Sequence, residues 1–208
     1  MTDRTWAIVP IRGLETAKTR LGRDLDAEER RDLVVSLLRR TLVATRDSRL
    51  IAGTIVVTMD PDAAGIARDH RAVGLVERAP GLNGAIAAAR SLAVARGASA
   101  VLVVPADLPA VSAAALDDLL AAAGNGTDGA RGLVAMVTDQ HASGTNTLFL
   151  RPPGVIDPQF GSGSRDLHRV AAVAAGATFV ELDGPLALDV DTPDDLVAAE
   201  AALGAIGA

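Results

Sequence analysis

A run of four apolar residues that leads into a carboxylate between two prolines constrains the fold more than any other feature. Residues 101–104 read Val-Leu-Val-Val, and Pro-Ala-Asp-Leu-Pro follows directly at 105–109. A strand without polar positions is typical of the centre of a parallel sheet, where helices cover both faces. Asp107 is then predicted just beyond the carboxyl end of this strand, where open α/β sheets bind ligands.

Asp107 has two interpretations when this segment is taken alone. One is a functional carboxylate at the ligand-binding edge of the sheet. The other is structural, because Asp commonly opens turns and caps helices, and a helix is predicted from Ser112. A second group of acidic residues near the end of the chain favours the functional interpretation.

The pattern of apolar residues predicts strands and helices in alternation. Strands are expected at residues 5–10, 51–58, 73–76, 101–104, 133–137, 145–150, 179–182 and 186–191. Helices are expected at residues 26–46, 61–70, 85–96, 112–123, 165–175 and from 192 onward. Asp26 and Glu29 have capping-box spacing at the first of these helices. Such alternation predicts one α/β domain over residues 1–208, a three-layer sandwich with a mainly parallel sheet.

Composition excludes several classes of protein. Hydrophobic residues make up 49% of the chain but aromatic residues only 2%, so Ala, Val, Leu and Ile must build the core. A net charge of −6 without a basic cluster argues against a nucleic-acid partner. The absence of cysteine excludes disulfides, thiolate zinc sites and a cysteine nucleophile. With no apolar signal region or membrane span, we expect a cytoplasmic protein without a membrane partner.

Two acidic residues near the end of the chain form the second group. Asp189 and Asp191 are two positions apart in an expected strand, so both carboxylates would project to one side. Adjacent carboxylates repel one another unless a cation lies between them, and Mg²⁺ binds a few carboxylates together with water and phosphate oxygens. With Asp107, the pair would hold one or two Mg²⁺ ions.

The neighbouring carboxylates Asp194 and Asp195 have a structural explanation. Thr192 can cap the last helix, Pro193 suits its first position, and acidic residues in a first turn face the positive end of the helix dipole. We therefore assign Asp194 and Asp195 to structure.

Lys18 is the only lysine among the 20 basic residues. It lies in the loop after the first expected strand, together with Arg12 and Arg20. An ammonium is a compact charge that a planar guanidinium does not replace freely against a phosphate. These cations are predicted to face the acidic residues across a cleft. A Walker A loop is excluded because Ala17 stands where that motif needs glycine, and no G-x-G-x-x-G dinucleotide fingerprint follows the strand.

A second anion site is predicted at residues 161–164, which read Gly-Ser-Gly-Ser before a helix. Inward-turned backbone N–H groups, a cap from Ser164 and the positive helix end would favour a phosphate or carboxylate. Positive charge is expected nearby from Arg165, His168 and Arg169. An ordinary glycine-rich turn remains the alternative, and the Gly-Thr-Asn-Thr segment at 144–147 is either a set of small hydrogen-bonding groups or a solvated strand start.

The three histidines, His70, His141 and His168, form neither a Ser–His–Asp order nor a metal-binding pattern. A phosphate acceptor is already an anionic nucleophile and needs no general base. An enzyme that uses one must instead hold two anions in line and neutralise the developing charge, which metals and cations do.

Six motifs together resemble one known family, the phosphoenolpyruvate/2-phospho-L-lactate guanylyltransferases of coenzyme F-420 biosynthesis. The motifs are Lys-Thr-Arg-Leu at 18–21, Gly-Leu-Asn at 81–83, Pro-Ala-Asp-Leu-Pro at 105–109, Gly-Thr-Asn-Thr at 144–147, Phe-Gly-Ser-Gly-Ser at 160–164 and Leu-Asp-Val-Asp-Thr-Pro at 188–193. Each is weak alone, but their order and combination are fairly specific, and they span nearly the whole chain.

The resemblance implies a nucleotidyltransferase with a glycosyltransferase-A-like fold that moves GMP from GTP to the phosphate of phosphoenolpyruvate and releases pyrophosphate. Mg²⁺ would be held by Asp107, Asp189 and Asp191. The small acid would contact Thr145, Gly161 and Ser164. The resemblance implies nucleotide contacts from Pro10, Arg12, Gly13, Lys18 and Asn83. It gives catalytic roles to Lys18, Arg20 and Asp107.

Other functions stay open at this point. The high Ala and Arg content suggests a high-GC bacterium, for which phosphoenolpyruvate is favoured over 2-phospho-L-lactate as acceptor. A molybdopterin or sugar-phosphate nucleotidyltransferase and a nucleotide-sugar glycosyltransferase would share the acidic motifs. A regulatory protein would bind GTP without releasing pyrophosphate. The sequence leaves a homodimer open.

Overall fold

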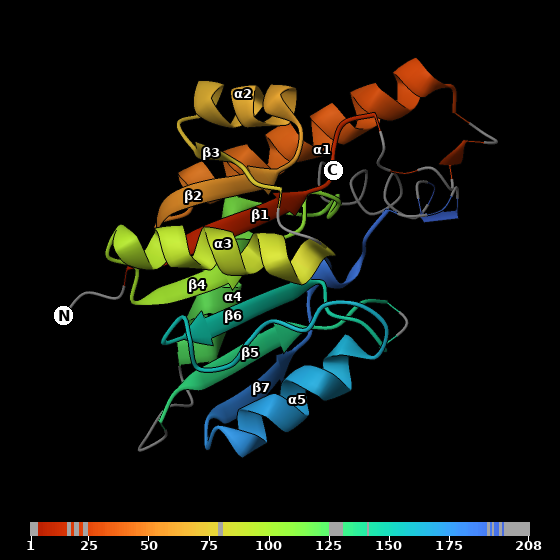
Figure 1. Ribbon diagram of the computed structural model, residues 1–208. Helices are drawn as coiled ribbons and strands as arrows, with labels where there is room; N and C mark the ends of the chain where they lie inside the picture. The colour runs from red at the N-terminus through yellow and green to blue at the C-terminus, as the bar shows by residue number, and fades with distance from the viewer. Residues whose placement is uncertain are drawn as a thin grey trace.

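A seven-stranded sheet between two layers of helices forms the protein in the computed structural model (Figure 1). The structure describes residues 4–15, 18, 21–22, 25–78, 81–124, 131–140, 142–190, 192, 194–195 and 197. In this part of the chain, no helix combines the length and apolar character needed to cross a membrane.

The strands follow the predicted alternation with the helices. The strands are β1 (Thr5–Ile11), β2 (Ile51–Thr58), β3 (Val73–Val76), β4 (Ala100–Val103), β5 (Leu133–Val137), β6 (Thr147–Arg151) and β7 (Thr178–Leu182). The helices are α1 (Ala27–Asp47), α2 (Pro61–Asp69), α3 (Gly81–Ala95), α4 (Ala113–Gly124) and α5 (Ser164–Ala174), with a short 3₁₀ turn η2 (Pro185–Ala187).

The sheet is mainly parallel, as predicted. Its strand order is β3-β2-β1-β4-β6-β5-β7, and only β6 runs antiparallel to its neighbours β4 and β5 among the described strands. The carboxyl ends of β1, β2, β3 and β4 therefore share one edge of the sheet. Because β6 is reversed, its first residue lies at that same edge.

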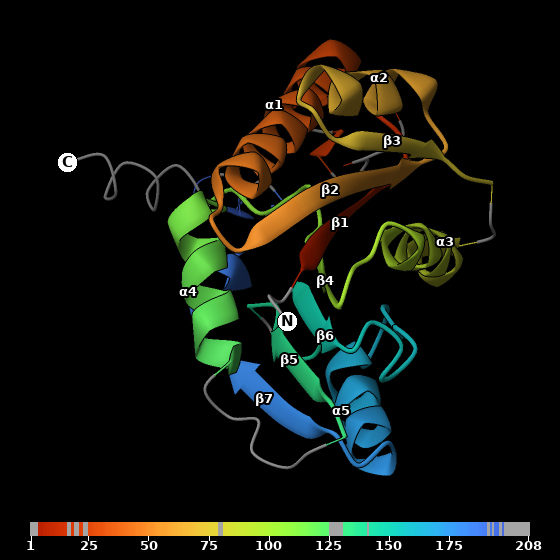
Figure 2. The same cartoon turned by 90° about the vertical axis from the view of Figure 1, so that its left-hand side faces the viewer.

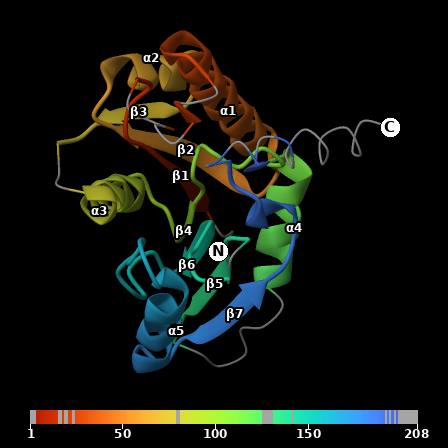
Figure 3. The same cartoon turned by 90° about the vertical axis from the view of Figure 1, so that its right-hand side faces the viewer.

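Apolar side chains on both faces of the sheet form the core. On one face Val101 and Val103 pack with Ile86 of α3 and Ala172 of α5. On the other face Leu102 packs with residues of α4, while β1 and β2 pack against α1 and α2. Figure 2 and Figure 3 show α1 and α4 on one side of the sheet and α3 and α5 on the other. The three-layer prediction is confirmed.

The first helix begins at the capping box that the sequence predicts. The Glu29 N–H donates to Asp26 Oδ1 at 2.9 Å, and the Asp26 N–H donates to Glu29 Oε2 at 2.8 Å. These two bonds satisfy backbone donors that the first helical turn leaves without partners. The buried Leu38 and Leu42 then attach α1 to the sheet.

The predicted strand over residues 186–191 is wrong. The chain forms the η2 turn and then runs without strand pairing through Val190, while Asp191 lies outside the described residues. Pro185 fixes a backbone angle suited to a helical turn and has no N–H for a sheet ladder. Asp189 is therefore positioned by loop contacts rather than by strand alternation.

Candidate active site

Asp107 lies at the carboxyl edge of the sheet and forms an ion pair with Lys18. Lys18 Nζ is 2.8 Å from Asp107 Oδ2. The start of α4 is capped instead by Ser112, whose Oγ accepts from the Ala115 N–H at 3.1 Å. The helix-cap interpretation of Asp107 is thus excluded.

Lys18 is held in an unusual backbone conformation. Its φ is +57°, in the left-handed region that residues other than glycine rarely adopt. Its side chain is only 8% exposed, whereas that of Asp107 is 31% exposed. Strained residues of this kind cluster at functional sites, and partial burial strengthens the attraction between opposite charges.

The segment that contains Asp189 lies against the segment that contains Asp107. The Val190 N–H donates to the Asp107 carbonyl oxygen at 3.1 Å. Asn146, which is buried, donates its amide N–H groups to the carbonyl oxygens of Leu186 at 3.0 Å and Ala187 at 2.8 Å. The same Nδ2 lies 3.5 Å from Asp189 Oδ1.

These contacts bring two of the three predicted metal ligands to one region. No cluster of three His, Cys, Asp or Glu side chains suited to a metal occurs within the described ranges. Asp191, the third predicted ligand, and Arg20, a predicted catalytic cation, lie outside them. Carboxylate oxygens from Asp107 and Asp189 suit Mg²⁺, which binds few protein carboxylates and takes its remaining ligands from water and phosphates.

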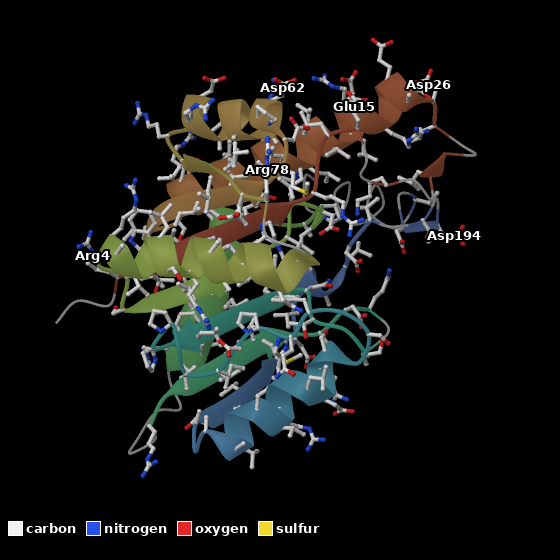
Figure 4. The ribbon with its side chains drawn as sticks, viewed as in Figure 1. Arg4, Glu15, Asp26, Asp62, Arg78 and Asp194 are labelled. Atoms are coloured by element: carbon white, nitrogen blue, oxygen red, sulfur yellow. The ribbon has the colours of Figure 1, made fainter. Side chains whose placement is uncertain are left out.

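A cavity of about 370 Å³ opens at the carboxyl ends of β1, β2 and β3, beside the start of α3. The lining residues are Pro10, Ile11, Arg12, Val57, Thr58, Met59, Glu77, Gly81, Leu82 and Ala85. Two predicted nucleotide contacts, Pro10 and Arg12, are among them. Figure 4 shows where this end of the sheet lies. Glu15, which follows β1, and Asp194 are on the side of the molecule opposite Arg4, which precedes β1.

Asp60 fixes the loop that follows β1. Its Oδ2 accepts from the Leu14 N–H at 2.9 Å, and its Oδ1 accepts from the Asp62 N–H at the start of α2. Burial opposes ionisation of Asp60, but these backbone N–H donors outweigh it and lower the pKa of its carboxyl group. The bond from the Leu14 N–H also holds the adjacent Gly13, a buried residue that belongs to the predicted nucleotide contacts.

The predicted nucleotide contact Asn83 instead joins α3 to the loop before α5. Its Nδ2 donates to the Phe160 carbonyl at 3.1 Å, and its Oδ1 accepts from the Phe160 N–H at 2.8 Å. The side chain thus holds the segment that leads to Gly161. A direct nucleotide contact from Asn83 stays a prediction.

Thr145 and Ser164, the predicted acceptor contacts, lie side by side. Ser164 Oγ donates to Thr145 Oγ1 at 3.0 Å. Of the two polar neighbours of Thr145, Asn146 binds the η2 carbonyls and Thr147 is buried inside β6. Gly161 is exposed beside this pair, and its carbonyl oxygen accepts from the Ser164 N–H at 3.1 Å.

The predicted cap from Ser164 is wrong. Gly163 is the N-cap of α5, with a left-handed φ of +71° that glycine adopts without strain, and no side chain caps the helix. Ser164 is the first helical residue and is only 1% exposed. Its hydroxyl is therefore used for Thr145 rather than for the helix end.

Sequence reasoning missed the role of His168. It is fully buried, and burial lowers its pKa from 6.5 to about 4, so the ring is neutral. His168 Nδ1 lies 3.1 Å from Thr145 Oγ1, and Nε2 accepts from the Gln159 N–H at 2.8 Å. The signal in the sequence is its position four residues after Ser164, on the same helix face.

The expected positive charge around this helix is largely compensated. Neutral His168 contributes none. Arg165 pairs with Glu181 at 3.0 Å, which raises the pKa of Arg165, and Arg169 pairs with Asp166 at 3.2 Å. The small acid would therefore meet hydroxyl and backbone donors here more than free cations.

Comparison with known proteins identifies the family. The family model described as "Guanylyl transferase CofC like" matches residues 5–200. The chain belongs to this family of guanylyltransferases. The phosphoenolpyruvate guanylyltransferase of Sphaerobacter thermophilus is 41% identical over 204 residues, which cover 97% of this chain and 96% of that protein. That of Rubrobacter xylanophilus is 39% identical over 200 residues, or 96% of this chain and 95% of the relative.

A solved structure shares the overall fold of this CofC-like chain. A 4-diphosphocytidyl-2C-methyl-D-erythritol synthase superposes with a TM-score of 0.64 at 13% sequence identity. The match covers 97% of this chain and 99% of that structure. At this identity the likeness bears on the fold alone, and it agrees with the α/β sandwich described above.

Proposed function

We propose that the protein transfers GMP from GTP to the phosphate of phosphoenolpyruvate and releases pyrophosphate. The observation that carries the proposal is the order of three features along one edge of the sheet. The cavity lies at β1–β3, the Lys18–Asp107 pair follows β1 and β4, and the Thr145–Ser164 hydroxyls lie at β6 and α5. Two substrates bound at either end would meet at the central ion pair.

The proposed reaction is an in-line displacement between two phosphates. An oxygen of the acceptor phosphate attacks the α-phosphorus of GTP, and the bond to the oxygen that bridges the α- and β-phosphates breaks. The acceptor needs no general base because its phosphate is already anionic, so the protein must position both anions and neutralise charge. Lys18 supplies a positive charge between the two substrate-binding ends of the site. Its side chain is only 8% exposed, so the ammonium group is shielded from water.

Magnesium is part of the proposal. Asp107, Asp189 and Asp191 would hold it, and a bound Mg²⁺ would neutralise phosphate charge and orient the reacting groups. The hydrogen bond from the Val190 N–H to the Asp107 carbonyl oxygen already holds the segments that carry Asp107 and Asp189 next to each other.

The protein is incubated with Mg²⁺, one nucleoside triphosphate and one phosphorylated acid at a time. Released pyrophosphate and the mass of the product are then measured. GTP with phosphoenolpyruvate is expected to give enolpyruvyl-diphospho-guanosine. A faster reaction with 2-phospho-L-lactate would reassign the acceptor. Turnover only with CTP or a sugar phosphate, or GTP binding without pyrophosphate release, would overturn the proposal.

The acceptor site is tested by Ser164→Ala. Removal of a hydroxyl that supports an anion contact is expected to raise the KM for phosphoenolpyruvate roughly tenfold and to leave the KM for GTP nearly unchanged. Ser91→Ala is the control because Ser91 is an exposed serine in the second half of α3, outside the predicted anion site and the cavity lining. An effect of Ser164→Ala confined to GTP would refute this assignment.

A further inference from the structure

Glu77 contributes the single carboxylate to the described lining of the cavity at β1–β3. It directly follows β3, where its N–H donates to the Thr58 carbonyl at 2.9 Å and continues the pairing with β2. Its Oε1 accepts from the Arg78 N–H at 2.7 Å. Glu77 is therefore a half-buried acidic residue in the wall of an otherwise mainly apolar cavity.

A carboxylate at this wall distinguishes the nucleobases by their hydrogen-bonding edges. An ionised carboxylate only accepts hydrogen bonds. Guanine presents two adjacent donors, N1–H and the 2-amino group, whereas adenine and cytosine present an acceptor nitrogen at the matching position. Apolar lining residues such as Val57 and Leu82 suit the faces of a flat base.

We propose that Glu77 selects guanine by accepting hydrogen bonds from N1–H and from the 2-amino group. The inference rests on the proposed function, since it assigns the cavity to the base of the nucleotide donor. Glu77 is then the specificity-determining residue of the nucleotide site.

The test compares kcat/KM for GTP, ITP and XTP with phosphoenolpyruvate as acceptor. ITP lacks the 2-amino group, so the wild-type protein should prefer GTP over ITP by roughly tenfold to hundredfold, the effect of a hydrogen bond to a charged group. Glu77→Gln should reduce this preference to near unity. It should also raise the use of XTP relative to GTP, because the Gln amide can donate to the 2-oxo group of xanthine.

Asp62→Asn is the matched control, because Asp62 is an exposed carboxylate on α2 outside the cavity (Figure 4). It should leave the GTP/ITP ratio at the wild-type value. An unchanged ratio in Glu77→Gln, or equal use of GTP and ITP by the wild-type protein, would overturn the inference. Failure of the wild-type protein to turn over any nucleotide would instead refute the proposed function.

A second, independent observation is the hydrogen-bond chain that ends at Thr145. Since the Gln159 N–H donates to His168 Nε2, the neutral ring carries its proton on Nδ1 and donates it to Thr145 Oγ1. Ser164 donates its hydroxyl proton to Thr145 Oγ1. The remaining hydroxyl proton belongs to Thr145, which is partly exposed, while Ser164 and His168 are buried.

We infer that His168 is a positioning residue that makes Thr145 donate outward, toward the acceptor anion. Thr145 Oγ1 already accepts from the ring and from Ser164, so its own proton is directed to the ligand. This inference also rests on the proposed function, because it assumes that the acceptor binds at Thr145.

Three substitutions separate this role from simple packing. His168→Phe keeps a ring beside Phe160 but removes both hydrogen bonds, His168→Asn keeps a donor near Thr145, and His168→Gln keeps an acceptor near Gln159. His168→Phe should raise the KM for phosphoenolpyruvate roughly tenfold more than the KM for GTP. His168→Asn should restore the acceptor KM better than His168→Gln.

Equal increases in the KM values for phosphoenolpyruvate and GTP, in proportion to the decrease in melting temperature, would mean that His168 has a purely structural role. This result would overturn the inference. Equal rescue by Asn and Gln would do the same, because it would separate the effect from the donor to Thr145. The wild-type assay with GTP and phosphoenolpyruvate tests the proposed function separately.

Discussion

Lys18 and Asp107 are 89 positions apart in sequence, yet their side chains form a partly buried ion pair. Lys18→Ala is expected to lower kcat by roughly 10²–10³, the effect of removing one preorganised group that stabilises transition-state charge. Lys18→Arg should recover little of it, because a planar guanidinium does not fit a position shaped for an ammonium. Steady-state kinetics measure the effect, with unchanged melting temperatures as the control for folding.

The neutrality of His168 makes stability depend on pH. Its pKa is about 4 in the folded chain and 6.5 in the unfolded chain, so the unfolded state binds more protons between these values. The free energy of unfolding should therefore fall as the pH is lowered through this window, by about 2 kcal/mol from pH 7 to pH 5. Denaturant unfolding at both pH values measures it. A slope that persists undiminished in His168→Phe would contradict this assignment.

Helix α2 packs directly on strand β3 at Gly74, where there is no room for a side chain. A Cβ at Gly74 would collide with the Ala64 carbonyl oxygen and lie 2.9 Å from the Ala64 Cα. Gly74→Ala should destabilise the protein by about 1–3 kcal/mol, because backbone atoms of α2 must move. Gly154→Ala is the control, since a Cβ there meets no atom within 4 Å. Comparable unfolding midpoints for the two variants would refute this packing argument.

Local patterns predict most elements but not the contacts between them. β2, β3 and β5 have the predicted bounds, and the Asp26 capping box forms, because apolar patterns and caps act over a few residues. The prediction of a strand at 186–191 was wrong, because alternating acidic residues do not by themselves provide a neighbouring strand for pairing.

The site shows the same limit. The bonds of Asn83 to Phe160 and of His168 to Thr145 join positions 77 and 23 residues apart, which no local pattern encodes. The antiparallel insertion of β6 is likewise a property of strand order. The predicted roles of Asp191 and Arg20 concern residues outside the described ranges.

Across the whole molecule, the site depends on segments that only the folded chain brings together. If Asp107 and Asp189 hold Mg²⁺, the ion should stabilise the folded protein in the presence of GTP. At a hundred times the dissociation constant, binding adds about 2.7 kcal/mol, which raises the melting temperature by roughly 5–10 °C. Thermal unfolding measures the shift without reference to turnover.

Asp189→Asn should abolish most of this shift and the Mg²⁺-dependent release of pyrophosphate, while leaving the fold intact. Asp183→Asn is the matched control, because Asp183 is an exposed carboxylate a few residues earlier. A full Mg²⁺ shift in Asp189→Asn would remove Asp189 from the metal site.

Asn146 is adjacent in sequence to Thr145 and binds two carbonyl oxygens, those of Leu186 and Ala187, in the turn before Asp189. The Asn146 side chain therefore connects Thr145, which is proposed to bind the acceptor, with the segment of Asp189, which is proposed to bind the metal ion. If Thr145 and Asp189 have these roles, the acceptor and the metal ion would be held at a fixed separation by contacts that the protein makes without either substrate.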